Sequence, residues 1–176
     1  MDTAEIFYIE RFSTPTGVVQ ILTDGEGRLR AADWETHDER MRTLLRRHYG
    51  AAGFQIVERS EASAARRAIE AYFAGDLAAL DGLIVHTRGT AFQEEVWAAL
   101  RAIPARQTRS YRDLAAAIGR PKAVRAVGLA NGSNPIAIVV PCHRVIGADG
   151  GLTGYGGGLD RKRWLLEHER DAPAPA

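Results

Sequence analysis

The sequence predicts a mixed α/β (α+β) protein, in which an N-terminal antiparallel sheet with helices precedes a C-terminal helical domain of the helix-turn-helix, winged-helix-like type. Short β-branched and aromatic runs between turn residues predict the sheet. A capped helix, a glycine and a second helical run predict the helix pair. The 176 residues are 45% hydrophobic and 26% charged, as in globular proteins with one large core or two small ones.

The first half alternates strands with turns and then with helices. Turn sequences at residues 14–17 and 24–27 separate three predicted strands, at residues 7–12, 18–23 and 29–34, which form an antiparallel meander. The next elements are a helix at 38–49 that ends at Gly50, a strand at 54–57, and a helix at 61–74 that ends at Gly75. Nothing in this half indicates chemistry of its own.

This punctuation divides the chain into four parts. They are an N-terminal domain at 1–80, a linker at 81–89, a C-terminal domain at 90–170 and a disordered tail at 171–176. The first twelve residues carry charges and no sustained apolar stretch, so we expect neither a signal peptide nor a membrane span. A single cysteine excludes an internal disulfide and favours a cytoplasmic location.

A helix pair is predicted around residues 110–130. Ser110 and Asp113 form a capping-box pattern that starts the first helix, and Gly119 suits a left-handed cap at its end. Pro121 suits the first turn of a second helix that runs to about residue 130. This spacing is typical of a helix-turn-helix, although any packed helix pair gives a similar pattern.

Charge favours the DNA-binding interpretation. Between Arg101 and Arg125 there are seven basic residues and one acid, whereas the whole chain has a net charge of only +1. Such asymmetry indicates a surface that contacts backbone phosphates. The second helix has small side chains and offers no Asn or Gln to read bases before residue 131, so Arg125 is either inserted into the duplex or contacts a phosphate.

The only cysteine, Cys142, lies in the sequence Pro141-Cys142-His143-Arg144. It follows the apolar run 136–140, which we expect to be a buried strand that gives way to a turn. A thiol beside an imidazole at such a place indicates a positioned nucleophile. The alternative is a small buried hydrophobic residue without chemistry.

Together these residues resemble the O6-alkylguanine-DNA alkyltransferase family, densely over residues 88–170. The matching motifs are Ser110-Tyr111, Pro121-Lys122-Ala123-Val124-Arg125-Ala126-Val127-Gly128, Asn134-Pro135, Pro141-Cys142-His143-Arg144-Val145, Gly154-Tyr155, Lys162, Trp164-Leu165-Leu166 and Glu169. The resemblance implies a ribonuclease H-like N-terminal domain. It also implies irreversible, single-turnover transfer of the alkyl group of O6-alkylguanine in DNA to Cys142, with O4-alkylthymine as a second substrate.

The resemblance also implies a role for each residue of the site. Cys142 is the nucleophile, His143 takes its proton through a water, and Glu169 orients the imidazole, with Glu167 as the competing glutamate. Tyr111 donates to the flipped guanine, whereas Asn134 holds the turn that carries the cysteine. The remaining residues are expected to contact DNA (Ser110, Lys122, Arg125, Ala126) or to form the guanine pocket (Val145, Tyr155, Gly156, Lys162). Many relatives have Ser where this chain has Gly156.

The partner that the resemblance implies is double-stranded DNA containing O6-alkylguanine. The protein is expected to be a monomer that binds the minor groove with little sequence preference and does not bind a membrane. No cofactor is expected, because the glycine-rich stretch 147–158 fits neither nucleotide-binding template. No metal is expected, because the histidines lack zinc-ligand spacing.

Two alternative functions remain open. One is a lesion-flagging, alkyltransferase-like protein that binds without reacting, which the presence of Cys142 disfavours. The other is a cysteine hydrolase, which would leave the basic helix pair unexplained and whose nucleophile and base usually lie far apart in sequence.

Overall fold

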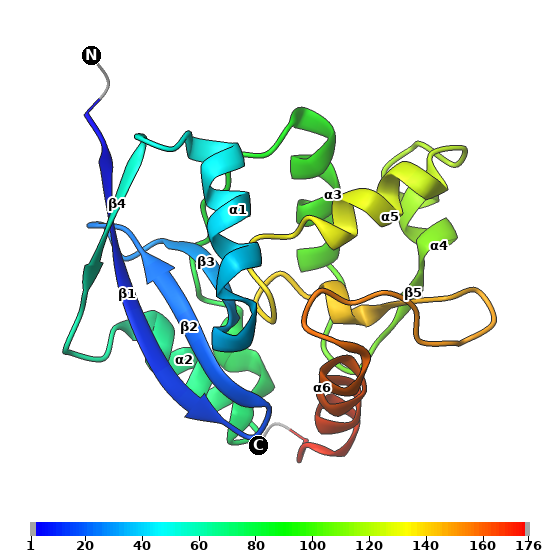
Figure 1. Cartoon of the computed structure of the whole chain (residues 1–176). Helices are drawn as coiled ribbons and strands as arrows, with labels where there is room; N and C mark the ends of the chain where they lie inside the picture. Colours follow the sequence, from blue (N-terminus) through cyan, green and yellow to red (C-terminus); the bar gives the residue numbers. More distant parts are fainter. Residues whose placement is uncertain (1–2, 175–176) are drawn as a thin grey trace.

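A computed structural model describes residues 3–174 of the chain. Figure 1 shows the N-terminal sheet at the left, covered by α1, and helices α3, α4 and α5 at the right. Strands β1 (Glu5–Thr14), β2 (Gly17–Thr23) and β3 (Leu29–Trp34) form the predicted antiparallel meander. Among the described residues no helix combines the length and the apolar character needed to cross a bilayer.

The fourth strand corrects the expectation of a purely antiparallel sheet. Strand β4 (Phe54–Glu58) pairs with β1 in parallel, and the strand order is β3-β2-β1-β4. The short 3-10 helix η1 (Glu35–His37) and helix α1 (Asp38–Tyr49) connect β3 to β4 across the sheet. Such a crossover returns the chain in the direction of β1, so the sheet is mixed.

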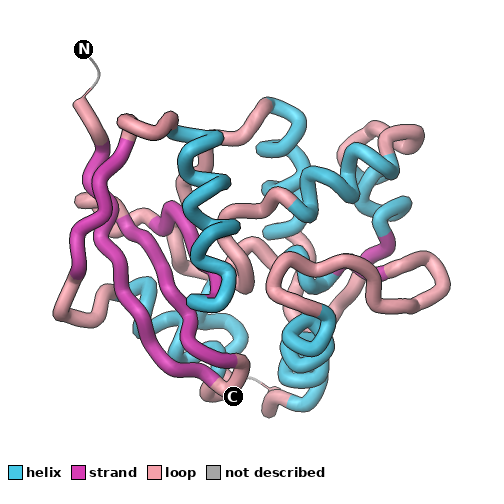
Figure 2. The backbone as a smooth tube through the Cα atoms, viewed as in Figure 1, coloured by secondary structure: helices cyan, strands magenta, loops and turns pink. Residues whose placement is uncertain are grey.

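Helices cover both faces of this sheet (Figure 2). Helix α1 ends at Gly50 as predicted and buries Met41 and Leu45 against Phe7 and Leu22. Helix α2 (Ala64–Phe73) begins later than predicted, because the Ser63 side chain caps it by accepting a hydrogen bond from the amide of Arg66. Its buried Ile69 and Tyr72 join the second and larger core cluster.

That larger cluster continues into the C-terminal half. It includes Trp34 and Tyr72 from the first half and Val96 and Leu165 from the second. After the 3-10 helix η2 (Leu77–Leu80), the expected linker 81–89 lies along the edge of the sheet, where the amide of Leu29 donates to the Ile84 carbonyl at 2.8 Å. The two halves therefore share one core.

The C-terminal half contains the predicted helix pair. Its elements are α3 (Ala91–Arg101), β5 (Arg109–Ser110), α4 (Tyr111–Ala117), α5 (Val124–Gly132), the 3-10 helix η3 (Cys142–Arg144), β6 (Val145–Ile146) and α6 (Leu159–Asp171). Ser110 and Asp113 form the predicted capping box, and Gly119 has a φ of 73°. Helix α5 starts at Val124, so Pro121 lies in the preceding turn and not, as predicted, in the first helical turn.

The apolar run before Cys142 is buried but is not the predicted strand. Ile136 makes one isolated bridge to Ala32, after which tight turns join Val139 to the Ala137 carbonyl and Cys142 to the Val140 carbonyl, each at 2.8 Å. Ile138 has a φ of 73°, a conformation that β-branched residues rarely adopt. These turns bring Cys142 back toward α5, as an extended strand could not.

The expected tail is also partly ordered. Asp171 is the last residue of α6, and the carbonyls of Ala172 and Pro173 accept hydrogen bonds from Arg106 at 2.6 and 2.9 Å. Residues 175–176 lie outside the described part of the chain.

Asp24 gives the N-terminal half a pH-dependent contribution to stability. Burial opposes the charge of its carboxylate, but hydrogen bonds from Arg30 and Arg28 outweigh this and lower its pKa to about 2. Because the folded-state pKa lies below the unfolded one, the contribution is complete above about pH 4 and is lost as the pH falls through 2.

We expect Asp24→Asn to reduce the free energy of unfolding by about 2 kcal/mol at pH 7 and by much less at pH 2.5. Urea denaturation at both pH values measures this. The matched control is Asp76→Asn, at an exposed position. Equal losses at both pH values would show that the Asp24 charge is not responsible.

Candidate active site

Cys142 lies at the start of η3, with its thiol in a small cavity between the two halves. The residue is 6% exposed. Asn134, Tyr155 and Gly156 line the cavity together with Asp33 and Arg40 from the N-terminal half. Only about 10 Å³ of it is open to a water-sized molecule, so the pocket is nearly closed in this conformation.

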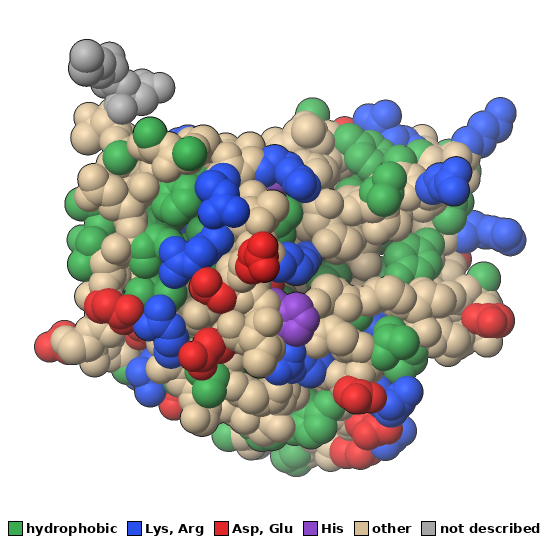
Figure 3. Space-filling view, in the orientation of Figure 1, with side chains coloured by type: hydrophobic (Ala, Val, Ile, Leu, Met, Phe, Trp, Pro, Cys, Tyr) green, Lys and Arg blue, Asp and Glu red, His purple; other side chains and the backbone are tan. Residues whose placement is uncertain are grey.

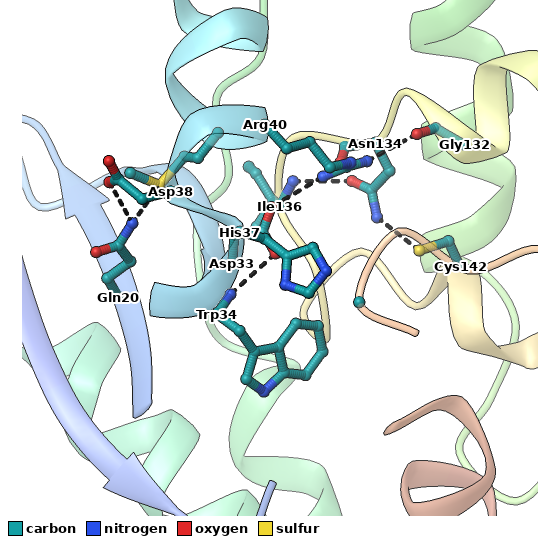
Figure 4. A network of polar contacts seen from close by, with 12 residues as sticks. Gln20, Asp33, Trp34, His37, Asp38, Arg40, Gly132, Asn134, Ile136 and Cys142 are labelled. Atoms are coloured by element: carbon teal, nitrogen blue, oxygen red, sulfur yellow. Dashed lines mark hydrogen bonds and ion pairs between the residues drawn. The ribbon is translucent and has the colours of Figure 1, made fainter. Parts of the chain in front are cut away.

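Asn134 does more than hold the turn. Its Oδ1 accepts from the Ile136 amide at 2.9 Å, and its Nδ2 donates to the Val140 carbonyl at 2.8 Å. The same Nδ2 lies 3.1 Å from Cys142 Sγ (Figure 4). A hydrogen bond to sulfur stabilises a thiolate, so this contact acts against the rise in the pKa of Cys142 that burial causes.

Burial favours the protonated form of this thiol. Burial raises the pKa of Cys142, and the Asn134 hydrogen bond and the charges of Arg40 and Lys162 offset this only in part. Burial likewise lowers the pKa of His143, against the opposing effect of Glu169. At neutral pH the two side chains are therefore a neutral thiol and a neutral imidazole.

Glu169, and not Glu167, contacts the imidazole. His143 Nε2 lies 2.7 Å from Glu169 Oε2, and both side chains are buried, whereas Glu167 is exposed. Arg144 donates to both oxygens of Glu169, at 2.8 and 3.0 Å. Burial alone would raise the pKa of Glu169, but His143 and Arg144 hold it well below its usual range, so the carboxylate stays ionised.

The second ring nitrogen of His143 is free to take a proton. Nδ1 is buried and has no hydrogen-bond partner among the described residues. If Glu169 accepts the proton on Nε2, neutral His143 presents the lone pair of Nδ1. Buried ring nitrogens normally have a partner, so Nδ1 is an acceptor that the described side chains leave unused.

Arg40 explains the glycine at position 156. Its guanidinium pairs with Asp33 at 2.9 Å and donates to the carbonyls of Gly132 and Asn134 at 2.7 and 3.3 Å (Figure 4). A Cβ at Gly156 would lie 2.8 Å from Arg40 Nε. A serine there would displace the guanidinium from these hydrogen bonds.

The other expected pocket residues divide into two groups. Tyr155 lines the cavity, and the Tyr111 hydroxyl accepts a hydrogen bond from Thr153 at 3.2 Å. Val145 and Lys162 are fully buried and, within residues 3–174, are not part of the cavity lining. Lys162 Nζ donates to the Val145 and Thr153 carbonyls, at 2.6 and 2.8 Å, and so supports the loop that forms the pocket wall.

The basic surface is smaller than the sequence predicts. Arg101 donates to the Leu80 and Leu83 carbonyls, Arg106 holds the C-terminal carbonyls, and Arg120 pairs with Glu95. Arg109 is half-exposed and donates to the Thr108 carbonyl and to Gln107, both at 2.9 Å. Within residues 3–174, Arg112, Lys122 and Arg125 are exposed and have no side-chain partner. Lys and Arg side chains project over α4 and α5 at the right-hand edge of Figure 3.

Helix α5 presents a narrow exposed face. Arg125, Ala126 and Leu129 are exposed on it, and Leu129 is 71% exposed. Arg125 makes no hydrogen bond or ion pair within residues 3–174, so its guanidinium is available to a ligand. Ser110 instead uses its hydroxyl to cap α4. In the described part of the chain no group of three or more His, Cys, Asp or Glu residues could hold a metal ion.

Sequence reasoning missed the contributions of the N-terminal half. Asp33 and Arg40 border the thiol, and the Tyr72 hydroxyl donates to Glu169 Oε2 at 2.7 Å. The sequence contains one local indication of this contribution, which is the charged residue Asp33 in a strand whose residues are all buried.

Comparisons with known proteins identify related sequences and structures. A family model described as "6-O-methylguanine DNA methyltransferase, DNA binding domain" matches residues 91–171. A methylated-DNA–protein-cysteine methyltransferase of Salmonella typhimurium is 52% identical over 160 residues, which cover 91% of this chain and 94% of that protein. A crystal structure of Mycobacterium tuberculosis OGT in complex with DNA is 41% identical, has a TM-score of 0.77, and is matched over 96% of both chains.

A buried thiol beside a helix-turn-helix, with an imidazole and a carboxylate behind it, defines a DNA-binding protein that uses a cysteine nucleophile. The similarity extends through both halves of the chain. The chain belongs to the family of methylated-DNA–protein-cysteine methyltransferases.

Proposed function

We propose that this protein repairs DNA by transferring the alkyl group of O6-alkylguanine, in a single irreversible turnover, to Cys142. The observation that carries this proposal is the position of Cys142 Sγ, hydrogen-bonded by Asn134 in a cavity beside the helix-turn-helix. His143, which follows Cys142 in η3, acts as the base, and Glu169 on α6 is its hydrogen-bond partner.

The proposed reaction balances without a cofactor. Sγ attacks the alkyl carbon in line, the carbon–oxygen bond breaks, and its electron pair goes to O6 of guanine. The thiol proton passes through a water to His143 Nδ1 as the carbon–sulfur bond forms, and Glu169 stabilises the imidazolium. The Tyr111 hydroxyl gives a proton to the leaving base, and His143 and Tyr111 then exchange protons with solvent.

The DNA-binding part of the proposal rests on α5. We propose that a monomer binds the minor groove, that small residues such as Ala126 allow close approach, and that Arg125 fills the gap left by the flipped base. Because the cavity at Cys142 is nearly closed, the loop that carries Tyr155 and Gly156 has to move before a guanine enters. We propose that Lys122 contacts a phosphate beside this helix, and that the Ser110 hydroxyl, which accepts from the Asp113 amide, donates its own proton to another phosphate.

Stoichiometry tests this proposal against the non-reacting alternative. A thioether is not cleaved by water or thiols, so a fixed amount of protein titrated with methylated duplex should repair one lesion per chain and then stop. Repair of substrate in molar excess would contradict single turnover. Binding without any loss of methyl groups from the DNA would favour the lesion-flagging alternative.

The two glutamates near the end of α6 provide a matched pair for the base. We expect Glu169→Gln to slow single-turnover transfer by roughly 100-fold, because the imidazolium loses its anionic partner, and to leave DNA affinity nearly unchanged. Glu167→Gln, at an exposed position on the same helix, should behave like wild type. Rapid-quench kinetics below the unfolding temperature of both variants measures this, and the reverse ranking would place the base elsewhere.

A further inference from the structure

The buried carboxylate of Glu169 receives a hydrogen bond from the opposite half of the chain. Tyr72 lies on α2, in the N-terminal half, and is fully buried. Its hydroxyl donates to Glu169 Oε2 at 2.7 Å, across 97 residues of sequence. Nothing in the proposed reaction yet uses this contact.

Further contacts between α2 and α6 surround this hydrogen bond. The Tyr72 carbonyl lies 2.7 Å from His168 Nε2 on α6, and the rings of these two residues meet edge to face with centroids 5.2 Å apart. Phe73 and Trp164 extend the same aromatic cluster. Because α2 and α6 pack together at this point, the Tyr72 phenol is positioned against the Glu169 carboxylate.

Three groups share one oxygen of that carboxylate. Glu169 Oε2 is 2.7 Å from His143 Nε2, 2.7 Å from the Tyr72 hydroxyl and 3.0 Å from Arg144 Nη2. Each donor takes part of the negative charge that would otherwise stabilise a protonated His143. Burial and the nearby Glu169 carboxylate raise the pKa of Tyr72 well above its usual value, so the phenol remains a donor at every working pH.

We propose that Tyr72 is a positioning residue through which the N-terminal half sets the proton affinity of the His143–Glu169 pair. This proposal rests on the proposed function, in which His143 accepts the thiol proton. Arg144 and Lys162 are the other charged groups that act on the pair. His168 and Tyr155 are the titratable groups close to Tyr72, with Cys142 beside Tyr155, and all of these remain when only the phenol hydroxyl is removed.

The expected effect has a definite sign. Without the Tyr72 hydroxyl, Glu169 keeps more of its charge for the imidazolium, so the pKa of His143 rises. His143 must be neutral to accept a proton, and the rate of transfer therefore falls at a higher pH than in wild type. We expect Tyr72→Phe to move the acidic limb of the pH–rate profile upward by roughly half to one pH unit.

The experiment is a single-turnover pH–rate profile on a methylated duplex, with DNA affinity measured in parallel. The control is Tyr49→Phe, which removes another N-terminal hydroxyl, one that accepts a hydrogen bond from Arg30, away from Glu169. A second variant carries 3-fluorotyrosine at position 72, which keeps the ring and is a stronger donor. It should move the acidic limb downward, and it supplies the test if Tyr72→Phe does not fold.

Opposite shifts of the acidic limb in the two Tyr72 variants, with DNA affinity close to wild type and no shift in Tyr49→Phe, support the proposal whatever the plateau rates. An acidic limb that stays in place in the Tyr72 variants that fold would overturn it, even if their plateau rates fall, because that result describes a purely structural contact. A wild-type protein that takes up no alkyl group would overturn the proposed function, and the Tyr72 proposal with it.

Discussion

We expect Cys142→Ala to abolish alkyl transfer and to leave DNA binding close to wild type. This is the largest effect that we expect, because no other side chain in the chain is a thiol, and the carboxylate of Asp33, which also lines the cavity, is paired with Arg40. The substitution removes one sulfur atom from a residue that is 6% exposed and leaves α5 and its cations untouched. Methyl release from labelled duplex and a gel-shift titration measure the two properties separately.

Asn134→Ala is a useful companion to this variant. It retains the thiol but removes the hydrogen bond to Sγ and the two bonds that hold the turn. It should therefore slow transfer without abolishing it. Residual transfer by Cys142→Ala would show that the nucleophile has been assigned to the wrong residue.

Arg125→Ala should lose roughly 100-fold in the single-turnover rate on a duplex and hardly any on free O6-alkylguanine base. In a duplex, the few kcal/mol needed to unstack and unpair the guanine are no longer offset by the inserted side chain. The free base has no stack to leave, so its rate depends only on the pocket around Cys142.

Two further variants separate flipping from simple docking. Arg125→Lys keeps the charge but loses the planar guanidinium, so it should behave mostly like alanine. Arg112→Ala removes a neighbouring exposed cation of the same surface and should weaken affinity without changing the ratio of duplex to free-base rates. A duplex defect that lysine rescues fully would reduce Arg125 to a phosphate contact, and equal losses on both substrates would give it a role in the fold.

Local patterns were sufficient to predict most elements of the fold. The β-branched and aromatic runs of β1 and β2 between turn residues, Gly50 after α1 and the Ser110 capping box are short-range features, and the structure confirms each. The parallel pairing of β4 with β1 depends on partners about fifty residues apart, which no local pattern encodes. The prediction of a strand at 136–140 was wrong. The β-branched residues of this run are buried in tight turns, which the Asn134 side chain and the surrounding core hold in place.

The site shows the same division. Cys142 and His143 adjoin in sequence, which indicated a positioned nucleophile but left a small buried hydrophobic residue as the alternative. The role of His143 as the base came from the resemblance to a family. Choosing Glu169 over Glu167 needed the resemblance to a family. Both glutamates lie on α6, and they differ only in that Glu169 faces the core whereas Glu167 faces solvent. The contributions of Tyr72 and Arg40 could not be predicted from the sequence. Tyr72 resembles an ordinary core residue and Arg40 an ordinary surface charge, and only the packing of the two halves brings them to the site.

The mass of the intact protein tests the central claim most directly. After incubation with an excess of duplex containing O6-methylguanine, the account predicts that every chain gains the mass of one methyl group in place of a hydrogen, and that peptide mapping finds it on Cys142. An unchanged mass while methyl groups leave the DNA, or a methyl group on any other residue, would contradict the account.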